Sequence, residues 1–479
     1  MTTKERIKKL VILNQIKMNT KNKNNLHFWE IALVFFILKI IEMQFKFSDG
    51  HTYMYMAKAV LEGMIPYRDF FFASPPLQIY IIAFGKILVG NEIILLNLIP
   101  IFATIGSSFF IFKFMQKKFG EIEGLVASTL YLFSFLVLLT TDYSTGIHLT
   151  TFFILGMIYF IEIDKPFIAG IFASFALLTR LYAPFPIAGA LIYLFIYKKK
   201  DILKFIVGAI TFFIPLSLFF EIISNGNYLN QIFFFRLNLI SGIGLSKIAV
   251  SQFFIIGDLI LVIGSILWIV FDKEKKKLAL PLITTIFSIF LYIIYSDIYY
   301  LYFGLIIGPL AIFTTKLIFK FKSYKNFNKL LAFLIILLVI INSIIYIANY
   351  ATASNIPFHK EISSFVKENS SEGDTIYGSF EITPLVSLES ERALAGNIID
   401  TNPKNIMTKE FEIEEIIEKI KGVKFIIVKA TLLESGELVG FDASTPSEFI
   451  QNNCTLVKEY PVVKDLSYSN IILVFDCKK

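Results

Sequence analysis

The chain has 479 residues, of which 56% are hydrophobic and only 17% are charged, and its mean hydropathy is +0.68. Soluble domains are about 45 to 50% apolar, so this composition excludes an ordinary soluble protein. The net charge of +7 comes from lysines clustered between apolar stretches, which is typical of membrane proteins, and nucleic acid is not an expected partner.

Apolar stretches of about 20 residues, the length of a helix that crosses a bilayer, occupy most of the chain. They predict a polytopic α-helical membrane domain over residues 28–349, preceded by a basic cytoplasmic tail (residues 1–27) without a cleavable signal peptide. About eleven spans are expected, at residues 28–46, 94–115, 122–141, 146–162, 165–180, 182–197, 203–222, 250–271, 278–295, 301–318 and 329–348.

Lysine clusters between these stretches predict the orientation, because cytoplasmic loops of membrane proteins are rich in lysine and arginine. All the clusters fall on one side of the predicted membrane, which we assign to the cytoplasmic side of the cell membrane. An odd number of spans then places the N-terminus in the cytoplasm and the C-terminal region outside it. The clusters are Lys4 to Lys23, Lys113 to Lys118, Lys198 to Lys204, Lys273 to Lys277 and Lys320 to Lys329.

The first loop outside the cytoplasm, residues 47–93, is long and too apolar to be a solvated linker. Thr52 to Gly63 predicts an interfacial helix, and Leu77 to Val89 predicts an apolar helix that is too short to span. A second long loop, Glu221 to Ala249, is aromatic next to Arg236. Irregular backbone at membrane depth is tolerated where protein or a water-filled cavity surrounds it, so both loops predict a roofed chamber.

From about Tyr350 the composition becomes that of a soluble fold. TIYGSF, VKFIIVKA, TLVKEY and NIILVF predict strands, and EIEEIIEKIKG and TPSEFIQNN predict helices. We therefore expect an extracytoplasmic α/β domain at residues 350–479. If the last two strands form a hairpin, Cys454 and Cys477 lie near each other at its open end, either as a disulfide in an oxidising compartment or as free thiols.

Asp49 follows the first predicted span directly and precedes an interfacial helix. A carboxylate at this depth is partly desolvated and can act as a general base. Aspartate is also a good N-cap residue for the helix that follows. The residue types alone leave both roles open.

Several motifs follow Asp49 in a fixed order: an A-x-x-x-L-x-G helix, PY-x-D-F, PPL-x-x-Y and a short apolar helix. This order resembles the first loop of the C-type (GT-C) membrane glycosyltransferases, in the branch of the protein O-mannosyltransferases and the lipid A aminoarabinose transferase. The likeness extends to the predicted topology and the C-terminal domain. It implies a GT-C fold with Asp49 as the catalytic carboxylate. Gly50 and Ser74 depart from the pattern, since many relatives have an acidic residue and a lysine there.

Three further residues are candidates for supporting Asp49 or positioning an acceptor. Asp142 lies where the third predicted span ends, a depth at which an ionisable residue is a functional candidate, and the resemblance implies a role there; a solvated loop acid is the alternative. Asp69 in PYRDF matches a subfamily pattern or forms a surface ion pair with Arg68. His51 is the third candidate.

Arg180, in LLTRLYAP, ends the fifth predicted span on the extracytoplasmic side. A guanidinium group binds phosphate oxygens bidentately and stabilises a phosphate leaving group. The resemblance implies that Arg180 binds a lipid phosphate, and snorkelling to ordinary lipid head groups is the alternative. Arg236 is a second candidate for lipid-phosphate binding, and Tyr302 is a further candidate for substrate contact.

Two histidines and two aspartates raise the question of a metal. His51 and His148 could join Asp49 and Asp142 as ligands, because imidazole and carboxylate together suit Mn²⁺ or Zn²⁺. Their spacing fits no metal motif, so we assign no cofactor, and a divalent metal stays an alternative. For His148 a hydrogen-bonded residue at a span entrance is the favoured interpretation.

The resemblance implies an inverting transfer of a sugar from a polyprenyl- or dolichyl-phosphate donor to an extracytoplasmic protein, lipid or glycan. Asp49 deprotonates the acceptor, and the lipid phosphate leaves towards Arg180. Phosphate is already a good leaving group, so the paired carboxylates of a glycoside hydrolase are not needed. A multi-span transporter or flippase and a non-catalytic assembly subunit are the alternative functions.

Overall fold

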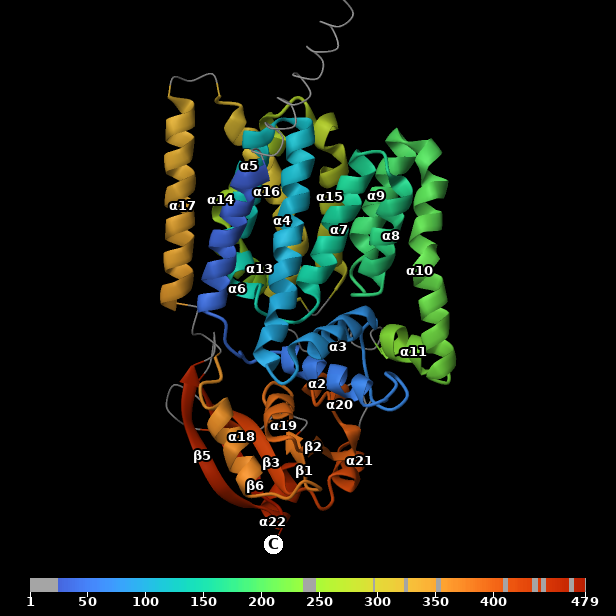
Figure 1. Ribbon diagram of the computed structural model, residues 1–479, viewed down its shortest axis with the longest axis vertical. Coiled ribbons are helices and arrows are strands. Elements are labelled where there is room, and N and C mark those ends of the chain that lie inside the picture. The colour runs from blue at the N-terminus through green and yellow to red at the C-terminus, as the bar shows by residue number, and fades with distance from the viewer. Residues whose placement is uncertain are drawn as a thin grey trace, which may run out of the picture.

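The computed structural model describes residues 25–235, 247–295, 298–322, 326–349, 355–407, 412–432, 438–440, 445–464 and 469–478. The chain forms three layers along its long axis (Figure 1). A bundle of long helices forms the first layer, α2, α3 and α11 lie across the bundle as the second, and a C-terminal α/β domain forms the third.

The bundle begins with a helix over residues 25–41. Its other helices are α4 (Leu98–Lys118), α5 (Glu121–Leu132), α6 (Phe135–Thr140), α7 (Ile147–Glu162), α8 (Pro166–Leu177), α9 (Pro184–Tyr197), α10 (Ile202–Ile223), α13 (Lys247–Gly257), α14 (Leu259–Phe271), α15 (Ala279–Ile294), α16 (Gly304–Phe319) and α17 (Phe327–Asn349).

Within the described residues, five helices are long and apolar enough to cross a membrane, or six if the bent pair α13 and α14 is one span. The five are Ile93–Lys118, Lys199–Ile223, Lys275–Ile294, Tyr300–Phe319 and Phe327–Ala348. Helices α3, α7, α8 and α9 are apolar but shorter. The structure thus has the expected apolar helical bundle, and the eleven-span count stays a prediction.

Two of the expected continuous spans are broken. The expected span at 122–141 is divided into α5 and α6, and the expected span at 250–271 is bent by 88° between α13 and α14. Asp258 explains both breaks: it lies at the bend, is buried, and its carboxylate accepts hydrogen bonds from the amides of Phe135 (2.9 Å) and Leu136 (3.0 Å) at the start of α6. A carboxylate at a helix N-terminus satisfies amides that would otherwise lack partners.

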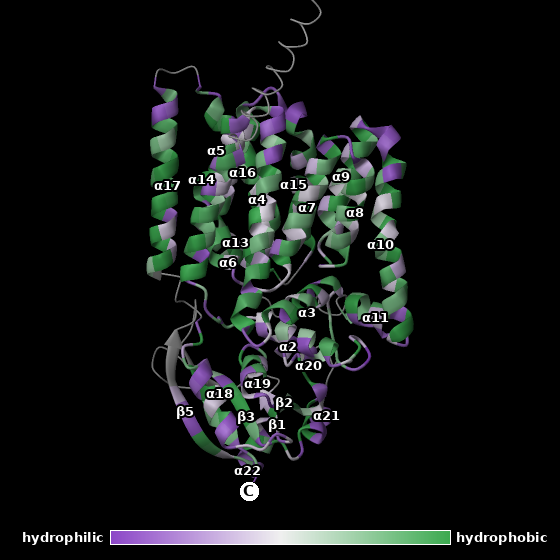
Figure 2. Cartoon of the chain, in the orientation of Figure 1, coloured by the Kyte–Doolittle hydropathy of each residue, from purple (hydrophilic) through white to green (hydrophobic). Residues whose placement is uncertain are grey.

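The lysines of the clusters at 113–118, 198–204 and 273–277, with Lys320 and Lys322, gather at the end of the bundle that is far from the C-terminal domain, where Figure 2 shows hydrophilic residues. The cluster from Lys4 to Lys23 lies outside the described residues. At this end of the bundle, lysine ammonium groups donate to carbonyl oxygens at the ends of neighbouring helices: Lys117 to Glu162 (2.7 Å), Lys118 to Lys277 (2.6 Å) and Lys320 to Phe271 (2.6 Å). Cations are favourable at helix C-termini. This arrangement agrees with a single cytoplasmic face, although the orientation itself stays a prediction.

The crosswise layer contains α2 (Gly50–Leu61), α3 (Leu77–Val89) and the single turn α11 (Asn227–Leu229). The sequence predicts that α2 lies along the membrane surface, yet most of its residues are buried. Figure 1 shows the reason: α2 lies between the bundle and the C-terminal domain, so protein covers both of its faces.

The C-terminal domain, residues 355–478, is built on a six-stranded sheet in the order β2-β1-β3-β6-β5, with β4 paired to β3. Strand β1 runs parallel to β2 and β3, whereas β6 is antiparallel to both β3 and β5. The strands are β1 (Thr375–Gly378), β2 (Ala393–Leu394), β3 (Phe425–Leu432), β4 (Leu438–Gly440), β5 (Thr455–Lys464) and β6 (Ser469–Asp476). The helices are α18 (His359–Glu368), α19 (Thr383–Ser390), α20 (Pro403–Met407), α21 (Ile413–Lys419) and α22 (Ser447–Asn453).

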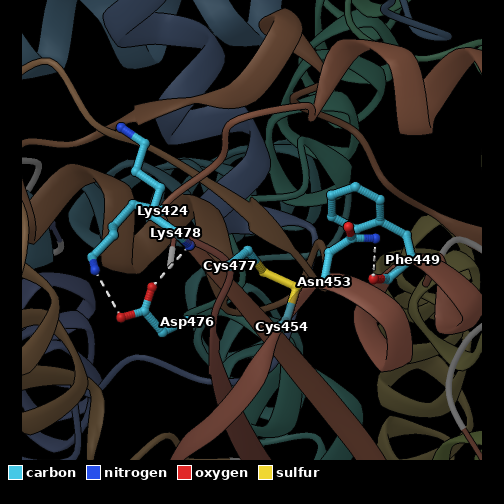
Figure 3. The surroundings of a disulfide bond; sticks show 7 residues. All are labelled: Lys424, Phe449, Asn453, Cys454, Asp476, Cys477 and Lys478. Carbon is cyan, nitrogen blue, oxygen red and sulfur yellow. Dashed lines mark hydrogen bonds and ion pairs between the residues drawn. A yellow bond between two sulfur atoms is a disulfide. The ribbon is translucent and has the colours of Figure 1, made fainter.

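A disulfide joins Cys454 to Cys477 at the open end of the β5–β6 hairpin (Figure 3). The hairpin pairs Thr455 with Asp476, so each cysteine lies one residue outside the last pair of the ladder. The bridge therefore ties α22 and the end of β6 together beside the ion pair between Lys424 and Asp476 (2.7 Å).

Candidate active site

Four segments that are far apart in the sequence meet where α2 begins. The start of α3 is joined to the end of α8 by a hydrogen bond from the Leu77 amide to the Leu178 carbonyl (2.9 Å). The α6–α7 loop contacts the start of α3, where Gln78 donates to the carbonyl of Ser144, and the start of α2, where Gly50 lies against Ser144. A Cβ atom at position 50 would be in van der Waals contact with this loop, 3.5 Å from the Ser144 amide nitrogen.

Asp49 stands at the N-cap position of α2 and is half-buried. Its side chain makes no capping hydrogen bond, so the structure does not use the carboxylate for the N-cap role that its position suggests. Residues four apart lie on the same face of a helix, so Asp49 and Tyr53 point in the same direction. The charge of Asp49 accordingly raises the pKa of the Tyr53 phenol, beside the larger effect of burial.

Arg180 follows α8 and is buried against Tyr53. One of its terminal nitrogens donates to the Tyr53 hydroxyl (3.2 Å) and to the Ser74 hydroxyl (3.0 Å), and the guanidinium carbon lies 5.0 Å from the centre of the Tyr53 ring. Tyr53 therefore contacts the guanidinium of Arg180 and shares a helix face with Asp49. Ser74, the position at which many relatives have a lysine, is in contact with the arginine.

Within the part of the chain that the structure describes, the Nε atom of Arg180 and the hydroxyl of Thr145 are buried and have no hydrogen-bond partner. Both groups adjoin Gly146, which begins α7 with a left-handed φ of 80°. A buried N–H donor without a hydrogen-bond partner costs free energy, unless a ligand or a water molecule accepts its hydrogen bond. An anion bound here would satisfy that donor and neutralise the charge.

The loop that carries Ser74 is held from two sides. Tyr67 is buried, and its hydroxyl donates to the Ser74 carbonyl (2.7 Å). The side-chain amide of Gln231 donates to the Tyr67 carbonyl (2.9 Å) and accepts from the Phe72 amide (2.9 Å). Gln231 thus fixes the loop from a segment more than 150 residues away in sequence.

Asp142 is buried in a cluster of charges at the exit of the first helix. Its carboxylate lies 2.6 Å from the ammonium group of Lys46 and 3.6 Å from that of Lys39. Both lysines also donate to the hydroxyl of Tyr346 on α17 (3.3 and 3.2 Å), and Lys39 pairs with Glu42. Asp142 is therefore no solvated loop acid. The cluster that it forms with Lys39 and Lys46 joins the first helix to α17. An acceptor-positioning role for it stays a prediction.

Asp69 lies in a surface turn. Its carboxylate binds Arg68 through two hydrogen bonds (2.9 and 3.0 Å) and accepts from the Ile65 amide (2.7 Å). The hydrogen bond from Arg68 lowers the pKa of Asp69. This geometry agrees with the surface ion pair that the sequence gives as the alternative to a site role.

The two histidines are both engaged in hydrogen bonds. His51, in the first turn of α2, faces the C-terminal domain with Nδ1 3.0 Å from the Glu381 carbonyl, and burial lowers its pKa to about 4. His148 is buried between the hydroxyls of Thr104 and Thr140, each 3.0 Å away. Among the described residues, no group of three or more His, Cys, Asp or Glu side chains is placed to hold a metal ion.

Arg236 lies outside the described residues. Tyr302 lies beside the site, with its ring 5.2 Å from that of Tyr182, the second residue after Arg180. Tyr53 is the residue that sequence reasoning missed most plainly, although its spacing of four from Asp49 on a helix could have revealed it.

The comparisons with known proteins bear on the family resemblance and on the fold. The family model described as dolichyl-phosphate-mannose-protein mannosyltransferase matches residues 73–223, which include Ser74, Gly146 and Arg180 but not Asp49. A comparison with curated protein sequences finds no match.

Several solved structures are similar in fold. The crystal structure of ArnT from Cupriavidus metallidurans bound to undecaprenyl phosphate aligns over 93% of this chain and 97% of that chain, with a TM-score of 0.69 and 11% identity. The Archaeoglobus fulgidus oligosaccharyltransferase aligns over 87% and 73%, with a TM-score of 0.57 and 12% identity. The arabinofuranosyltransferase AftD from Mycobacteria aligns over 95% and 40%, with a TM-score of 0.53 and 11% identity.

The chain therefore has the fold of the GT-C membrane glycosyltransferases. Within that class it resembles the branch that contains the protein mannosyltransferases and ArnT, which confirms the resemblance seen in the sequence.

Proposed function

We propose that this protein is an integral membrane glycosyltransferase that moves a sugar from a polyprenyl-phosphate donor to an acceptor outside the cytoplasm. The observation that carries the proposal is that Tyr53, which shares a face of α2 with the half-buried carboxylate of Asp49, contacts Arg180, a buried guanidinium with an unused donor. The matched family is named for a dolichyl-phosphate sugar, and ArnT was solved with undecaprenyl phosphate. Both names support a lipid-phosphate donor.

In the proposed reaction, Asp49 takes the proton from an acceptor hydroxyl or amine. The acceptor atom then forms a bond to C1 of the sugar while the bond from C1 to the phosphate oxygen breaks, which inverts the configuration at C1. The lipid phosphate leaves with the bonding electron pair, and Arg180 stabilises its charge. A preorganised donor at the point where charge develops supplies catalysis without a general acid.

Arg180 is also proposed to replace the lysine that many relatives carry at the position of Ser74. Its guanidinium contacts the Ser74 hydroxyl directly, so a cation occupies this side of the site although the local residue is neutral. A planar guanidinium offers two parallel donors to phosphate, whereas lysine offers a single point charge.

The experiment measures the binding of labelled undecaprenyl phosphate to purified protein in detergent. Arg180→Ala is expected to weaken binding about 10- to 100-fold, because hydrogen bonds to charged groups contribute about 1.5 to 3 kcal/mol each. Arg68→Ala, which removes an exposed arginine of the same layer, is the matched control and should bind like the wild type.

The uncharged polyprenol is the second probe, because it keeps the prenyl chain and lacks the phosphate. It should bind weakly and equally to the wild type and to Arg180→Ala. If undecaprenyl phosphate also binds the wild type and Arg180→Ala equally, the assignment of Arg180 to the donor phosphate is wrong.

A further inference from the structure

The first turn of α2 has two faces with different neighbours. Successive residues of a helix are turned by about 100°, so position 51 points away from the face that carries Asp49 and Tyr53, and position 52 lies on the flank beside that face. The face of Asp49 and Tyr53 contacts Arg180 through Tyr53. His51 on the opposite face and Thr52 on the flank pack on the C-terminal domain.

The contacts of His51 and Thr52 with the C-terminal domain are directed at backbone atoms. The hydroxyl of Thr52 donates to the carbonyl of Phe380 (3.1 Å), and Nδ1 of His51 lies within hydrogen-bond distance of the carbonyl of Glu381 (3.0 Å). Consecutive residues of α2 thus hold consecutive carbonyls before α19. His51 is 3% exposed and Thr52 is 2% exposed, so water does not compete for these bonds.

Two more contacts extend the attachment along the same segment. Further along α2, the hydroxyl of Tyr55 accepts a hydrogen bond from the amide of Leu394 (3.1 Å). Ahead of Asp49, the carbonyl of Phe45 accepts from the amide of Ile356 (2.9 Å). The C-terminal domain therefore holds the chain on both sides of Asp49.

We infer that the C-terminal domain is part of the catalytic apparatus: it fixes the rotation and height of α2, and so the direction of the Asp49 carboxylate, through the positioning residues His51 and Thr52. The inference rests on the proposed function of Asp49. It assigns to the domain a role within the site itself, whether or not the domain also selects the acceptor. Displacing a reacting group by about 1 Å can lower a rate about 100-fold. A small shift of Asp49 on loss of these contacts would therefore be enough to lower the rate.

The test uses substitutions that keep shape and remove one hydrogen bond. Thr52→Val removes the hydroxyl with almost no change in volume, and Thr52→Ser keeps it. His51→Asn places an amide donor where Nδ1 lies, whereas His51→Ala removes the donor. Thr211→Val is the control, because its hydroxyl bonds to Val207 within its own helix.

Two readouts are compared for each full-length variant. Thr52→Val and His51→Ala are expected to lower kcat about ten-fold with the KM for the donor unchanged, and Thr52→Ser and His51→Asn should recover most of it. Amide hydrogen exchange over residues 45–57 should rise in the same two variants and not in Thr211→Val. The exchange measurement needs no turnover, so it is independent of the proposed reaction.

The outcomes separate the two proposals. If exchange in residues 45–57 is unchanged in Thr52→Val and His51→Ala, these contacts do not hold α2 and the inference is overturned. Faster exchange with an unchanged kcat overturns the link between the domain and Asp49 and leaves the transferase proposal intact. If Asp49→Asn itself leaves kcat unchanged, the proposed role of Asp49 fails first, whatever the exchange shows.

Discussion

Asp142→Asn is expected to lower the free energy of unfolding by about 3 to 5 kcal/mol, the cost of removing one partner from a buried ion pair. The carboxylate lies between two buried ammonium groups, those of Lys46 and Lys39. Neutralising it leaves Lys46 without its close carboxylate partner inside the protein. Thermal unfolding of the purified variant in detergent measures the effect as a large fall in Tm.

Asp164→Asn is the matched control for this change. Asp164 also pairs with a lysine, Lys198 at 2.5 Å, but its side chain is 71% exposed. Exposed pairs contribute about 0 to 1 kcal/mol, so its Tm should stay close to that of the wild type. Equal behaviour of the two variants would contradict a stabilising role for Asp142. A stable Asp142→Asn with low turnover would instead favour the acceptor-positioning role.

Gly146→Ala is expected to lower kcat/KM at least about 100-fold, because displacement of groups in a site by about 1 Å costs that much. A Cβ atom at this position would lie 2.0 Å from the Gln78 amide oxygen and 3.1 Å from Nε of Arg180. Both side chains would have to move, and the left-handed backbone adds strain of about 1 to 2 kcal/mol. Steady-state kinetics with a lipid-phosphate sugar provide the measurement.

Gly63→Ala separates strain from displacement. Gly63 lies in the turn that follows α2 and has a φ of 93°, and a Cβ atom there would meet no atom within 4 Å. This variant carries the backbone cost without a clash, so its kcat/KM should remain within a few-fold of the wild type. If Gly146→Ala is as active as Gly63→Ala, displacement of Gln78 and Arg180 does not impair catalysis, and the expected role of this packing is wrong.

Hydropathy predicts much of the fold, because a helix in lipid must be apolar along its length. The long helices α4, α10, α15, α16 and α17 lie close to expected spans. The breaks between α5 and α6 and between α13 and α14 are not predictable in this way. They depend on the carboxylate of Asp258, whose partners are more than 120 residues away in sequence.

In the C-terminal domain, too, some elements are predictable from the sequence and others are not. Strands β1, β3, β5 and β6 overlap the segments TIYGSF, VKFIIVKA, TLVKEY and NIILVF, in which the sequence predicts strands. Strands β2 and β4 contain two and three residues, too few for a pattern, and are defined by their pairing with β1 and β3.

For the site, residue type and membrane depth identify Asp49 and Arg180 as candidates, but not Tyr53, which contacts Arg180. The contacts of His51 and Asp142 could not be predicted, because their partners come from distant segments. The carbonyl that His51 contacts is 330 residues away, and Asp142 meets Lys39 of the first helix and Lys46 just beyond it. A single apolar or charged residue carries no information about such partners.

The most direct test is the transfer of labelled sugar from a panel of polyprenyl-phosphate sugars by the purified protein, comparing the wild type with Asp49→Asn. If Asp49 is the general base, the wild type should release the lipid phosphate from at least one donor, and a folded Asp49→Asn should have a kcat about 10² to 10⁴ lower, the usual contribution of a general base. Turnover by Asp49→Asn equal to that of the wild type would contradict this role.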